Sequence, residues 1–356
     1  MKITSIEARF EHFELVRPYA ISFRPMMDSV ENGIVTITTD DGRTGHGAAA
    51  PEHFVTGETP QICSAALNDD ALSWLIGRDV RELPALCRQL HSRTENAPAA
   101  RAAVDIALHD LLAQYLGVPL VDMLGRAHTS LPTSITIGIK PLADTLEEAD
   151  EYLGRGFRIL KIKLGDSLES DLERLVRLRE HIGNNALIRV DPNQGYSAAD
   201  VGEFVRRTAN LDIEFLEQPT AAKDIELMKN LPQHVRDQIA ADESLLNESD
   251  ALALVAPPRA CGIFNIKLMK CGGIRPGLRI AAIAEAAGVS LMWGCMDESI
   301  ISITGALHAA LASPATRYLD LDGSLDLARD VVTGGFILED GCLRTSDKPG
   351  LGLLPL

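Results

Sequence analysis

The sequence predicts an α/β protein in which an eight-stranded barrel follows a smaller α+β unit. Three observations indicate this fold. From about residue 133 onward, short apolar strands alternate with amphipathic helices. A polar residue ends each strand at intervals that match one strand–helix unit. The first part of the chain lacks this alternation, and 356 residues allow a barrel with an additional unit.

The N-terminal unit is expected to span residues 1–125 and to combine strands with helices. Alternation of apolar and polar residues predicts strands at 3–13 and 30–49, and Asp41-Gly42 is typical of a hairpin turn. Apolar residues at helical spacing then predict helices at 64–77, 81–92 and 98–117.

The barrel is expected to span residues 126–330. Its eight strands are predicted at 134–140, 157–165, 186–194, 213–219, 238–244, 262–270, 290–298 and 317–323. Helical patterns between them imply parallel strands joined by right-handed crossovers. An open doubly wound sheet is the alternative, disfavoured because no GxGxxG follows the first strand. The tail, 331–356, contains a hairpin pattern and is expected to pack back on the N-terminal unit.

Charge and composition disfavour several classes of protein. The net charge is −16, so nucleic acids and anionic membrane surfaces are not expected as partners. Apolar runs stay well short of the roughly 20 residues that span a bilayer, and the charged N-terminus does not resemble a secretory signal. A soluble, cytoplasmic protein is expected. The six cysteines lack CxxC spacing, which argues against disulfides and zinc.

Three carboxylates end successive predicted strands: Asp191, Glu217 and Asp242. Because the carboxyl ends of barrel strands meet at one mouth, these side chains are expected to lie together. Carboxylate oxygens suit one Mg²⁺, which also keeps several waters. The alternative is that they cap the following helices, a position that Asp favours and Glu does not. Asn193 would lie on the same face as Asp191, near the metal or the substrate.

Two lysines, Lys163 and Lys267, end the second and sixth predicted strands, which lie opposite each other in an eight-stranded barrel. A substrate between them would lose a proton on one face and regain one on the other, through an enediolate whose charge a divalent metal stabilises. Lys161, two residues before Lys163, is expected to lower the pKa of that lysine. The alternative for each lysine alone is a solvated surface role.

Several motifs resemble the muconate lactonizing subgroup of the enolase superfamily: KIKLG (161–165), DPNQ (191–194), EQP (217–219), ADES (241–244), NIKLMKCGG (265–273), GCMDES (294–299) and PGLGL near the end. The resemblance covers essentially the whole chain. It implies a (β/α)7β modified TIM barrel, with an α+β capping domain formed by the N-terminal region and the C-terminal tail. It also implies Lys163 and Lys267 as acid/base groups, Asp191, Glu217 and Asp242 as ligands of one Mg²⁺ per subunit, and a homo-oligomer.

Within that subgroup, Asp320-Leu321-Asp322 resembles the dipeptide epimerases, in which two carboxylates hold the α-ammonium of the substrate while the metal holds its C-terminal carboxylate. Alternate strand residues point to one face, so both acids would lie on the same side. The alternative is a plain strand end followed by a turn. The expected activity is that of an isomerase that epimerises the C-terminal residue of a dipeptide.

The side chains of the dipeptide are indicated by conflicting residues. Arg24 resembles the glutamate contact of Ala-Glu epimerases. Asp297, which follows Met296, and Glu52 add negative charge at the mouth and favour cationic dipeptides that contain Lys or Arg. The GCMDES motif and the segment after it resemble this cationic branch, which is our preferred prediction. Thr136 is a further expected substrate contact.

Other activities remain open at this point. Within the resemblance they are an L-Ala-D/L-Glu epimerase, a hydrophobic dipeptide epimerase, an N-acylamino-acid racemase, an o-succinylbenzoate synthase and a cycloisomerase. From another class, the chain would be a non-catalytic binding barrel. The small-molecule dipeptide remains the expected partner.

Overall fold

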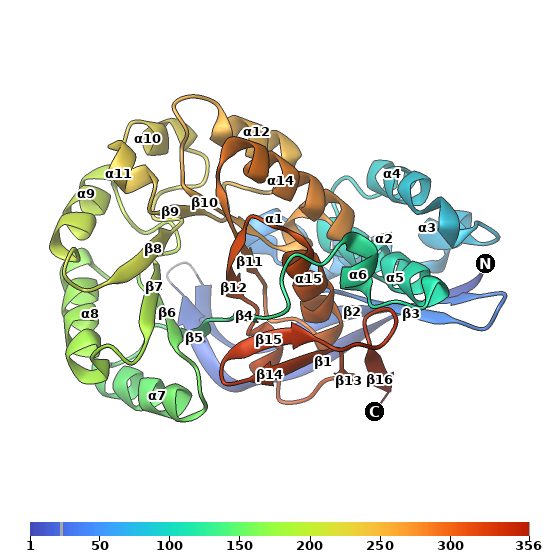
Figure 1. Ribbon diagram of the computed structural model, residues 1–356, viewed down its shortest axis with the longest axis horizontal. Helices are drawn as coiled ribbons and strands as arrows, with labels where there is room; N and C mark the ends of the chain where they lie inside the picture. Colours follow the sequence, from blue (N-terminus) through green and yellow to red (C-terminus); the bar gives the residue numbers. More distant parts are fainter. Residues whose placement is uncertain (22–23, 356) are drawn as a thin grey trace.

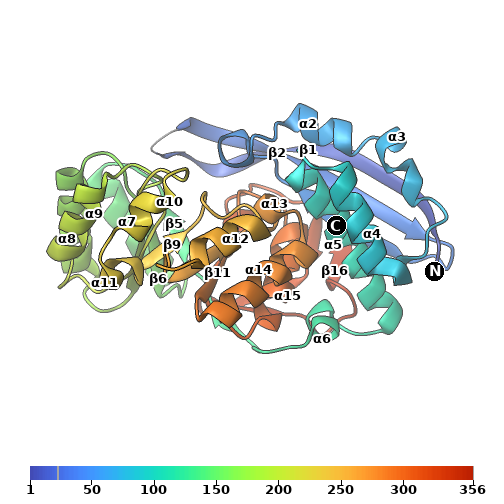
Figure 2. The same ribbon diagram turned by 90° about the horizontal axis from the view of Figure 1, so that it is seen from above.

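The computed structural model describes residues 1–21 and 24–355. The chain forms a capping unit and a barrel that lie side by side, and both termini lie at the capping end (Figures 1 and 2). Among the described helices, none combines the length and apolar character that a membrane crossing requires. All six cysteines are free; four are buried, and Cys295 and Cys342 are half-buried.

Eight parallel strands form the barrel, in chain order around the sheet. They are β5 (Ile135–Ile137), β6 (Ile159–Lys163), β7 (Leu187–Asp191), β8 (Ile213–Glu217), β9 (Ile239–Ala241), β10 (Ile263–Ile266), β11 (Ser290–Gly294) and β12 (Thr316–Asp320). A parallel bridge between Thr133 and Leu319 joins the two ends of the sheet, and the Ser134 N–H donates to the Leu319 carbonyl at 3.1 Å. The predicted barrel is confirmed.

Helices pack around the outside of the barrel (Figure 1). They are α7 (Leu142–Gly154), α8 (Leu168–Ile182), α9 (Ala198–Arg207), α10 (Ile225–Lys229), α11 (Gln233–Arg236), α12 (Glu248–Val255), α13 (Leu268–Cys271), α14 (Ile274–Ala287) and α15 (Ile300–Ala312). The eighth strand is followed by a short 3₁₀ turn, η3 (Gly323–Leu325), in place of an eighth barrel helix. This is the predicted (β/α)7β arrangement.

Strand β9 is shorter than the predicted 238–244. Its ladder stops at Ala241 because the next backbone donors turn to a side chain. The N–H groups of Asp242 and Ser244 donate to Gln218 Oε1 at 2.9 and 3.1 Å. The residues after the strand therefore form a turn at the barrel mouth.

The capping unit contains an antiparallel sheet of β1 (Ile3–Ile21), β2 (Arg24–Thr39) and β3 (Thr44–Ala49). Its helices are α1 (His53–Thr56), α2 (Pro60–Ala66), α3 (Asp69–Leu72), η1 (Ser73–Leu75), η2 (Val80–Glu82), α4 (Leu83–Arg93), α5 (Pro98–Leu116) and α6 (Leu120–Leu124). The single helix predicted at 64–77 is wrong. Asn68 divides it, because its side chain accepts the Ala71 N–H at 2.8 Å and starts a new helix.

Strands β1 and β2 continue beyond the predicted ranges and form a long hairpin that reaches the barrel (Figure 2). Leu15 bridges to Leu327, and the Val16 N–H donates to the Asp326 carbonyl at 2.8 Å. Arg17 forms an ion pair with Glu151 of α7 at 2.5 Å. These barrel contacts extend the hairpin where the alternation of the sequence fades.

Helix α5 joins the capping sheet to the barrel. Gly47 of β3 lies so close to the helix that a Cβ there would fall 1.8 Å from the Ala103 carbonyl oxygen. On the barrel side, Asp105 Oδ1 accepts the Ile274 N–H at 2.7 Å, at the start of α14. The helix is therefore fixed on both sides, by close backbone approach and by a buried carboxylate.

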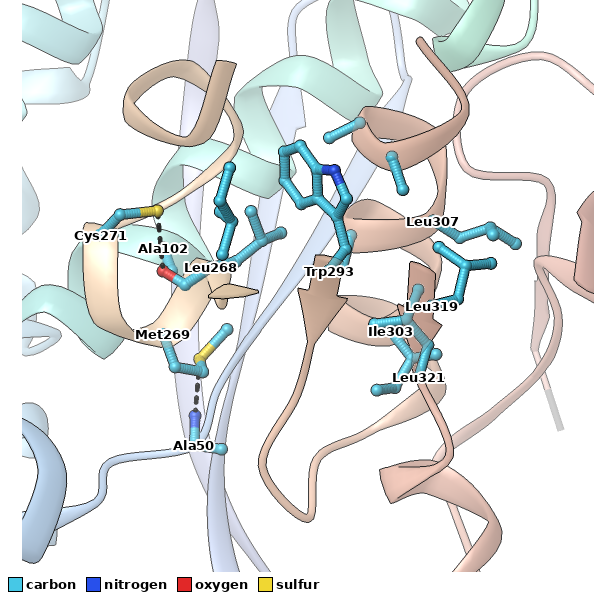
Figure 3. Close-up of a cluster of buried hydrophobic side chains, with 14 of the residues drawn as sticks. Ala50, Ala102, Leu268, Met269, Cys271, Trp293, Ile303, Leu307, Leu319 and Leu321 are labelled. Carbon is cyan, nitrogen blue, oxygen red and sulfur yellow. Dashed lines mark hydrogen bonds between the residues drawn. The ribbon is translucent and has the colours of Figure 1, made fainter. Parts of the chain in front are cut away.

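The short helix α13 also packs against the capping unit. Figure 3 shows Met269 pointing toward Ala50, whose N–H donates to the Met269 sulfur at 3.2 Å. The same view shows Trp293 of β11 in the neighbouring core, where its Nε1 donates to Thr316 Oγ1 at 3.1 Å. Because α13 begins directly after Lys267, capping-unit contacts help to place that lysine.

The C-terminal segment contributes two small sheets, formed by β13 (Val332–Gly334) with β16 (Leu353–Pro355), and by β14 (Phe336–Glu339) with β15 (Cys342–Thr345) and β4 (Leu131–Pro132). The Leu351 N–H donates to Asp110 Oδ1 at 2.8 Å, and the Leu120 N–H donates to the Gly350 carbonyl at 2.9 Å. The segment thus contacts α5 and α6 of the capping unit.

Candidate active site

A cavity of about 130 Å³ lies at the carboxyl ends of the barrel strands, beneath the β1–β2 hairpin. Eleven of the fourteen predicted site residues line it: Glu52, Thr136, Lys161, Lys163, Asn193, Asp242, Lys267, Met296, Asp297, Asp320 and Asp322. Asp191 and Glu217 are fully buried next to it. The side chain of Arg24 lies outside the described residues. The structure therefore brings thirteen predicted residues to one end of the barrel.

Lys161 lies at the centre of the buried charges. Its Nζ is 2.7 Å from Asp320 Oδ2, 2.8 Å from Glu217 Oε2 and 3.5 Å from Asp191 Oδ2. Burial alone would lower its pKa, but these three carboxylates raise the pKa well above the ordinary value. Lys161 is thus a fixed cation that joins side chains from four strands.

The two outer lysines bind different members of the carboxylate trio. Lys163 Nζ lies 2.7 Å from Asp191 Oδ2, and Lys267 Nζ lies 2.8 Å from Asp242 Oδ2. Lys163 ends β6 and Lys267 follows β10, four places further around the eight-stranded sheet. The amines therefore approach the cavity from opposite sides of the barrel, with the carboxylates between them.

The three carboxylates differ in proton affinity. Burial, with the nearby charges of Asp191 and Asp242, raises the pKa of Glu217 to about 8, against the opposing charge of Lys161. Burial would also raise the pKa of Asp191 and Asp242, but their lysine partners lower both below the ordinary value. Burial therefore outweighs the single lysine partner of Glu217, whereas the lysine partners of Asp191 and Asp242 outweigh burial.

The chemistry of this donor set fits a divalent cation. Glu217 Oε2 is buried and forms an ion pair with Lys161 Nζ at 2.8 Å but accepts no hydrogen bond of good geometry, so this oxygen has bonding capacity left for a cation. Three carboxylates and a nearby cavity are the surroundings that Mg²⁺ uses. In this structure the ammonium groups of Lys161, Lys163 and Lys267 satisfy most of the oxygens.

Asp320 and Asp322 lie where β12 meets β5. Asp320 Oδ1 accepts the Ser134 hydroxyl at 2.6 Å, and Asp322 Oδ2 accepts the Thr136 N–H at 2.7 Å. Burial, reinforced by the charge of Asp320, raises the pKa of Asp322 to about 6. Asp320 is neutralised by Lys161, whereas Asp322 has no cationic side chain within 4.0 Å among the described residues. The second carboxylate is therefore available to a cationic ligand.

Acidic side chains also dominate the rim of the cavity. Eight carboxylates line it, against five lysine and arginine side chains. Asp326 and Glu148 belong to this set and were not predicted from the sequence. Burial, together with the charges of Asp322 and Asp297, raises the pKa of Asp326 to about 8. The excess of negative charge favours a cationic ligand in this cavity.

Three buried residues that support the site were also missed. Lys270 Nζ contacts Asp242 Oδ1 and donates to the Asn265 carbonyl at 3.0 Å, while Asn265 Nδ2 donates to Glu217 Oε1 at 2.8 Å. Gln218 holds the turn after β9 and has a positive φ of 29°. Lys270 follows Lys267 by one helical turn, and this spacing is the one sequence signal that would have revealed any of them.

Two family models match the chain. The model for the mandelate racemase/muconate lactonizing enzyme N-terminal domain matches residues 5–125, and the model described as enolase C-terminal domain-like matches residues 144–355. Together they cover both structural units and most of the chain.

Individual relatives match along nearly their whole length. The chain is 62% identical to an L-Lys-D/L-Arg epimerase of Methylococcus capsulatus over 99% of both chains. It is 36% identical to an L-Ala-D/L-Glu epimerase of Clostridium acetobutylicum over 95% of both. The crystal structure of the dipeptide epimerase from Methylococcus capsulatus, complexed with Mg and the dipeptide L-Arg-D-Lys, superimposes with a TM-score of 0.98 over 99% of this chain and 100% of that one.

Proposed function

The chain belongs to the mandelate racemase/muconate lactonizing enzyme family of the enolase superfamily, and on this premise we propose that it is a magnesium-dependent isomerase that epimerises the C-terminal residue of cationic dipeptides. The observation that carries the proposal is the pair of lysines on opposite sides of the barrel, each bound to a different carboxylate of one trio. The alternative of an Ala-Glu substrate is disfavoured by the acidic cavity, because a glutamate side chain would be repelled there.

Lys163 and Lys267 exchange one proton each with the substrate. One amine accepts the proton of the α-carbon as that C–H bond breaks, and the opposite ammonium donates a proton as a new C–H bond forms on the other face. The configuration inverts and no proton is gained or lost overall. A lysine must be neutral to accept a proton, so its ion pair with Asp191 or Asp242 has to weaken before the reaction.

Asp191, Glu217 and Asp242 would hold the magnesium ion. When bound, the ion supplies positive charge beside the substrate carboxylate, where negative charge develops as the α-proton leaves. Lys161 contributes a second, permanent cation at the same place, since its ammonium is fixed by Glu217 and Asp320.

The acidic groups bind the remainder of the dipeptide. We assign the α-ammonium to Asp322 and Asp320, and the cationic side chains to Glu52 and Asp297 at the rim, where Met296 supplies apolar contact. Thr136 and Asn193 line the cavity and would contact the backbone of the dipeptide. Arg24 stays a predicted substrate contact, whose side chain lies outside the described residues.

Isotope exchange at the α-carbon tests the two-lysine mechanism. Lys163→Ala and Lys267→Ala are each incubated in D₂O with both epimers of a Lys-Arg dipeptide. Epimerisation should fall by about 10²–10⁴-fold in both variants, whereas each variant should still exchange the α-hydrogen of the one epimer that the remaining lysine deprotonates. The control, Lys348→Ala, removes an exposed lysine of the C-terminal segment and should match the wild type. Unchanged epimerisation in either active-site variant would refute the mechanism.

A second experiment separates a dipeptide epimerase from an N-acylamino-acid racemase. Asp322→Asn should raise KM for dipeptides with a free α-ammonium about tenfold or more, because a charge-assisted hydrogen bond is lost. N-Acetylated dipeptides, which lack that charge, should be poor substrates of both proteins. Equal activity of wild type and variant on free dipeptides would favour the racemase or cycloisomerase alternatives.

The assembly and location of the protein are part of the same proposal. We propose a homo-oligomer that works in the cytoplasm, in line with membership of the family. Light scattering coupled to size-exclusion chromatography measures the assembly directly, and a mass equal to one chain would contradict it.

A further inference from the structure

A second cavity, of about 520 Å³, lies between the capping unit and the barrel. Helices α4 and α5 form one wall, and α12, α14 and the turn after α13 form the other. It shares no lining residue with the active-site cavity. Its volume falls within the range of small-molecule sites, roughly 300–1,000 Å³.

The lining of this cavity is cationic, although the chain as a whole has a net charge of −16. Four arginines, Arg88, Arg101, Arg275 and Arg279, face two carboxylates, Asp105 and Glu248. Both carboxylates are already engaged. Glu248 lies 2.6 Å from Arg279, and Asp105 Oδ1 accepts backbone N–H groups at the start of α14.

Three of the arginines therefore lack an acidic partner. Within the described part of the chain, no carboxylate oxygen lies within 4.0 Å of a side-chain nitrogen of Arg88, Arg101 or Arg275. Arg101 is the deepest of them, with 7% of its surface exposed. Its two terminal nitrogens make only long bonds, of 3.5 Å to the Thr94 carbonyl and 3.4 Å to the Cys271 carbonyl.

The Nε atoms of Arg101 and Arg275 are buried and have no hydrogen-bond partner. A buried cation without an anion is costly, because it loses hydration and gains no compensating charge. Burial accordingly lowers the pKa of Arg101. The planar guanidinium group matches carboxylate and phosphate oxygens, so an oxyanion in the cavity would supply the missing charge.

A metal ion is the competing occupant. One ligand atom each from Cys87, Asp105 and His109 lies within 4.8 Å of the others at the wall of this cavity. However, His109 Nδ1 already bonds to the Asp105 carbonyl at 2.7 Å, and Asp105 bonds to the α14 backbone. The surrounding arginines would also repel a cation. The excess of arginines in the lining therefore favours an anion over a metal ion.

We infer that this cavity between the capping unit and the barrel binds a small molecule with phosphate or carboxylate groups. Arg101 forms the cationic floor, Arg275 the side, and Arg88 and Arg279 the exposed entrance. The floor also includes Gly272, at φ 91°, where a Cβ would lie 1.9 Å from Arg101 Nε. The site thus depends on a close approach that only glycine permits.

Calorimetric titration of the protein with small anions tests the inference. The protein is freed of metal first, so that the heat does not include chelation of magnesium by the anion. The probes are inorganic phosphate, pyrophosphate and citrate, at an ionic strength held constant with potassium chloride. At least one probe should bind, and Arg88→Gln and Arg275→Gln should each weaken it about tenfold or more. Arg206→Gln removes an exposed arginine of α9 and serves as the matched control, with unchanged affinity expected.

The outcomes separate the sources of binding. Preference for phosphate and pyrophosphate identifies a phosphorylated ligand, and preference for citrate identifies a carboxylate ligand; either supports the site. Binding that is lost in Lys267→Ala and kept in Arg88→Gln would place the anion in the active site and overturn the inference. Absence of binding by all three probes would overturn it as well. Arg88 is exposed, so Arg88→Gln tests the site without a risk to folding.

Discussion

Replacement of Asp105 measures how strongly the capping unit is joined to the barrel. The side chain is 2% exposed and accepts the Ile274 N–H at 2.7 Å and the Arg275 N–H at 3.3 Å. It also lies 3.2 Å from His109 Nδ1. In Asp105→Ala, the buried Ile274 N–H loses its acceptor, at about 1–3 kcal/mol. His109 keeps the backbone carbonyl of residue 105 at 2.7 Å and loses only the facing charge, at about 1–2 kcal/mol. The free energy of unfolding should therefore fall by about 2–5 kcal/mol, a large share of the roughly 5–15 kcal/mol of a typical domain.

Asp105→Asn removes the negative charge of this side chain but keeps its size and one acceptor oxygen. The amide oxygen can still accept the Ile274 N–H, but the negative charge opposite His109 is lost. The expected loss is smaller, about 1–2 kcal/mol. Urea denaturation followed by tryptophan fluorescence reports both units, because Trp74 lies in the capping unit and Trp293 in the barrel.

A matched control exists on the surface. Asp150 forms a pair with His181 at 2.9 Å, but both side chains are exposed. Asp150→Asn should change the free energy of unfolding by less than about 0.5 kcal/mol. The reasoning fails if Asp150→Asn and Asp105→Asn destabilise the protein equally, because burial is then irrelevant to the strength of the pair.

The buried pair of Asp105 and His109 also makes the stability of the fold depend on pH. Burial and Arg275 lower the pKa of His109, but Asp105 raises it on balance above the usual 6.5. Burial would raise the pKa of Asp105, but His109 lowers it on balance below the usual 3.8. The pair therefore stabilises the fold fully between about pH 4 and 6.5, and the histidine contribution is lost as the pH rises through its folded pKa. The stability difference between wild type and His109→Gln should shrink from pH 6 to pH 9, and a growing difference would contradict the assignment.

Three further predictions concern packing, a buried histidine and the metal. Gly47→Ala should lower the thermal midpoint by several degrees, because its Cβ would overlap the Ala103 carbonyl, whereas Gly202→Ala, with nothing within 4 Å, should be neutral or slightly stabilising. Burial lowers the pKa of His308 to about 3, and its Nδ1 accepts the Val121 N–H at 2.8 Å. The wild type should therefore lose stability relative to His308→Gln as the pH falls from 6.5 toward 3, because the unfolded histidine binds a proton first. A stability difference that stays constant over this range would refute the prediction. Magnesium at 100 times its Kd should raise the unfolding free energy by about 2.7 kcal/mol, and chelation should reverse the gain.

The barrel could be predicted because its pattern is local and repeated. Each strand ends in a residue whose chemistry is visible in the sequence, such as Asp191 or Glu217, and the spacing of these residues gives the strand order. The helix expected at 64–77 failed for a local reason, since the pattern gave less weight to Asn68 as a helix start than to the apolar residues around it. The hairpin beyond Phe13 was not predicted for a tertiary reason, since its partners Leu327 and Glu151 lie far away in the sequence.

The charge interactions within the site were less predictable than the identity of the residues that line it. Lys161 was expected to act on the pKa of Lys163 by repulsion. The structure shows a further role that was not predicted, because the same ammonium group pairs with Glu217 and Asp320. Lys270 and Gln218 were missed, because their roles depend on which backbone groups the folded turns expose.

The closure of the barrel between β12 and β5 has a consequence for any study of the enzyme. The few bonds that fasten this seam include those from Ser134 to Asp320 and from Thr136 to Asp322. The carboxylates assigned to the substrate thus also hold the first and last strands of the barrel together. A substitution at either carboxylate changes ligand recognition and weakens the barrel closure at the same time. Loss of turnover in such a variant therefore has to be interpreted with a measurement of local opening at this seam, such as amide hydrogen exchange at Thr136.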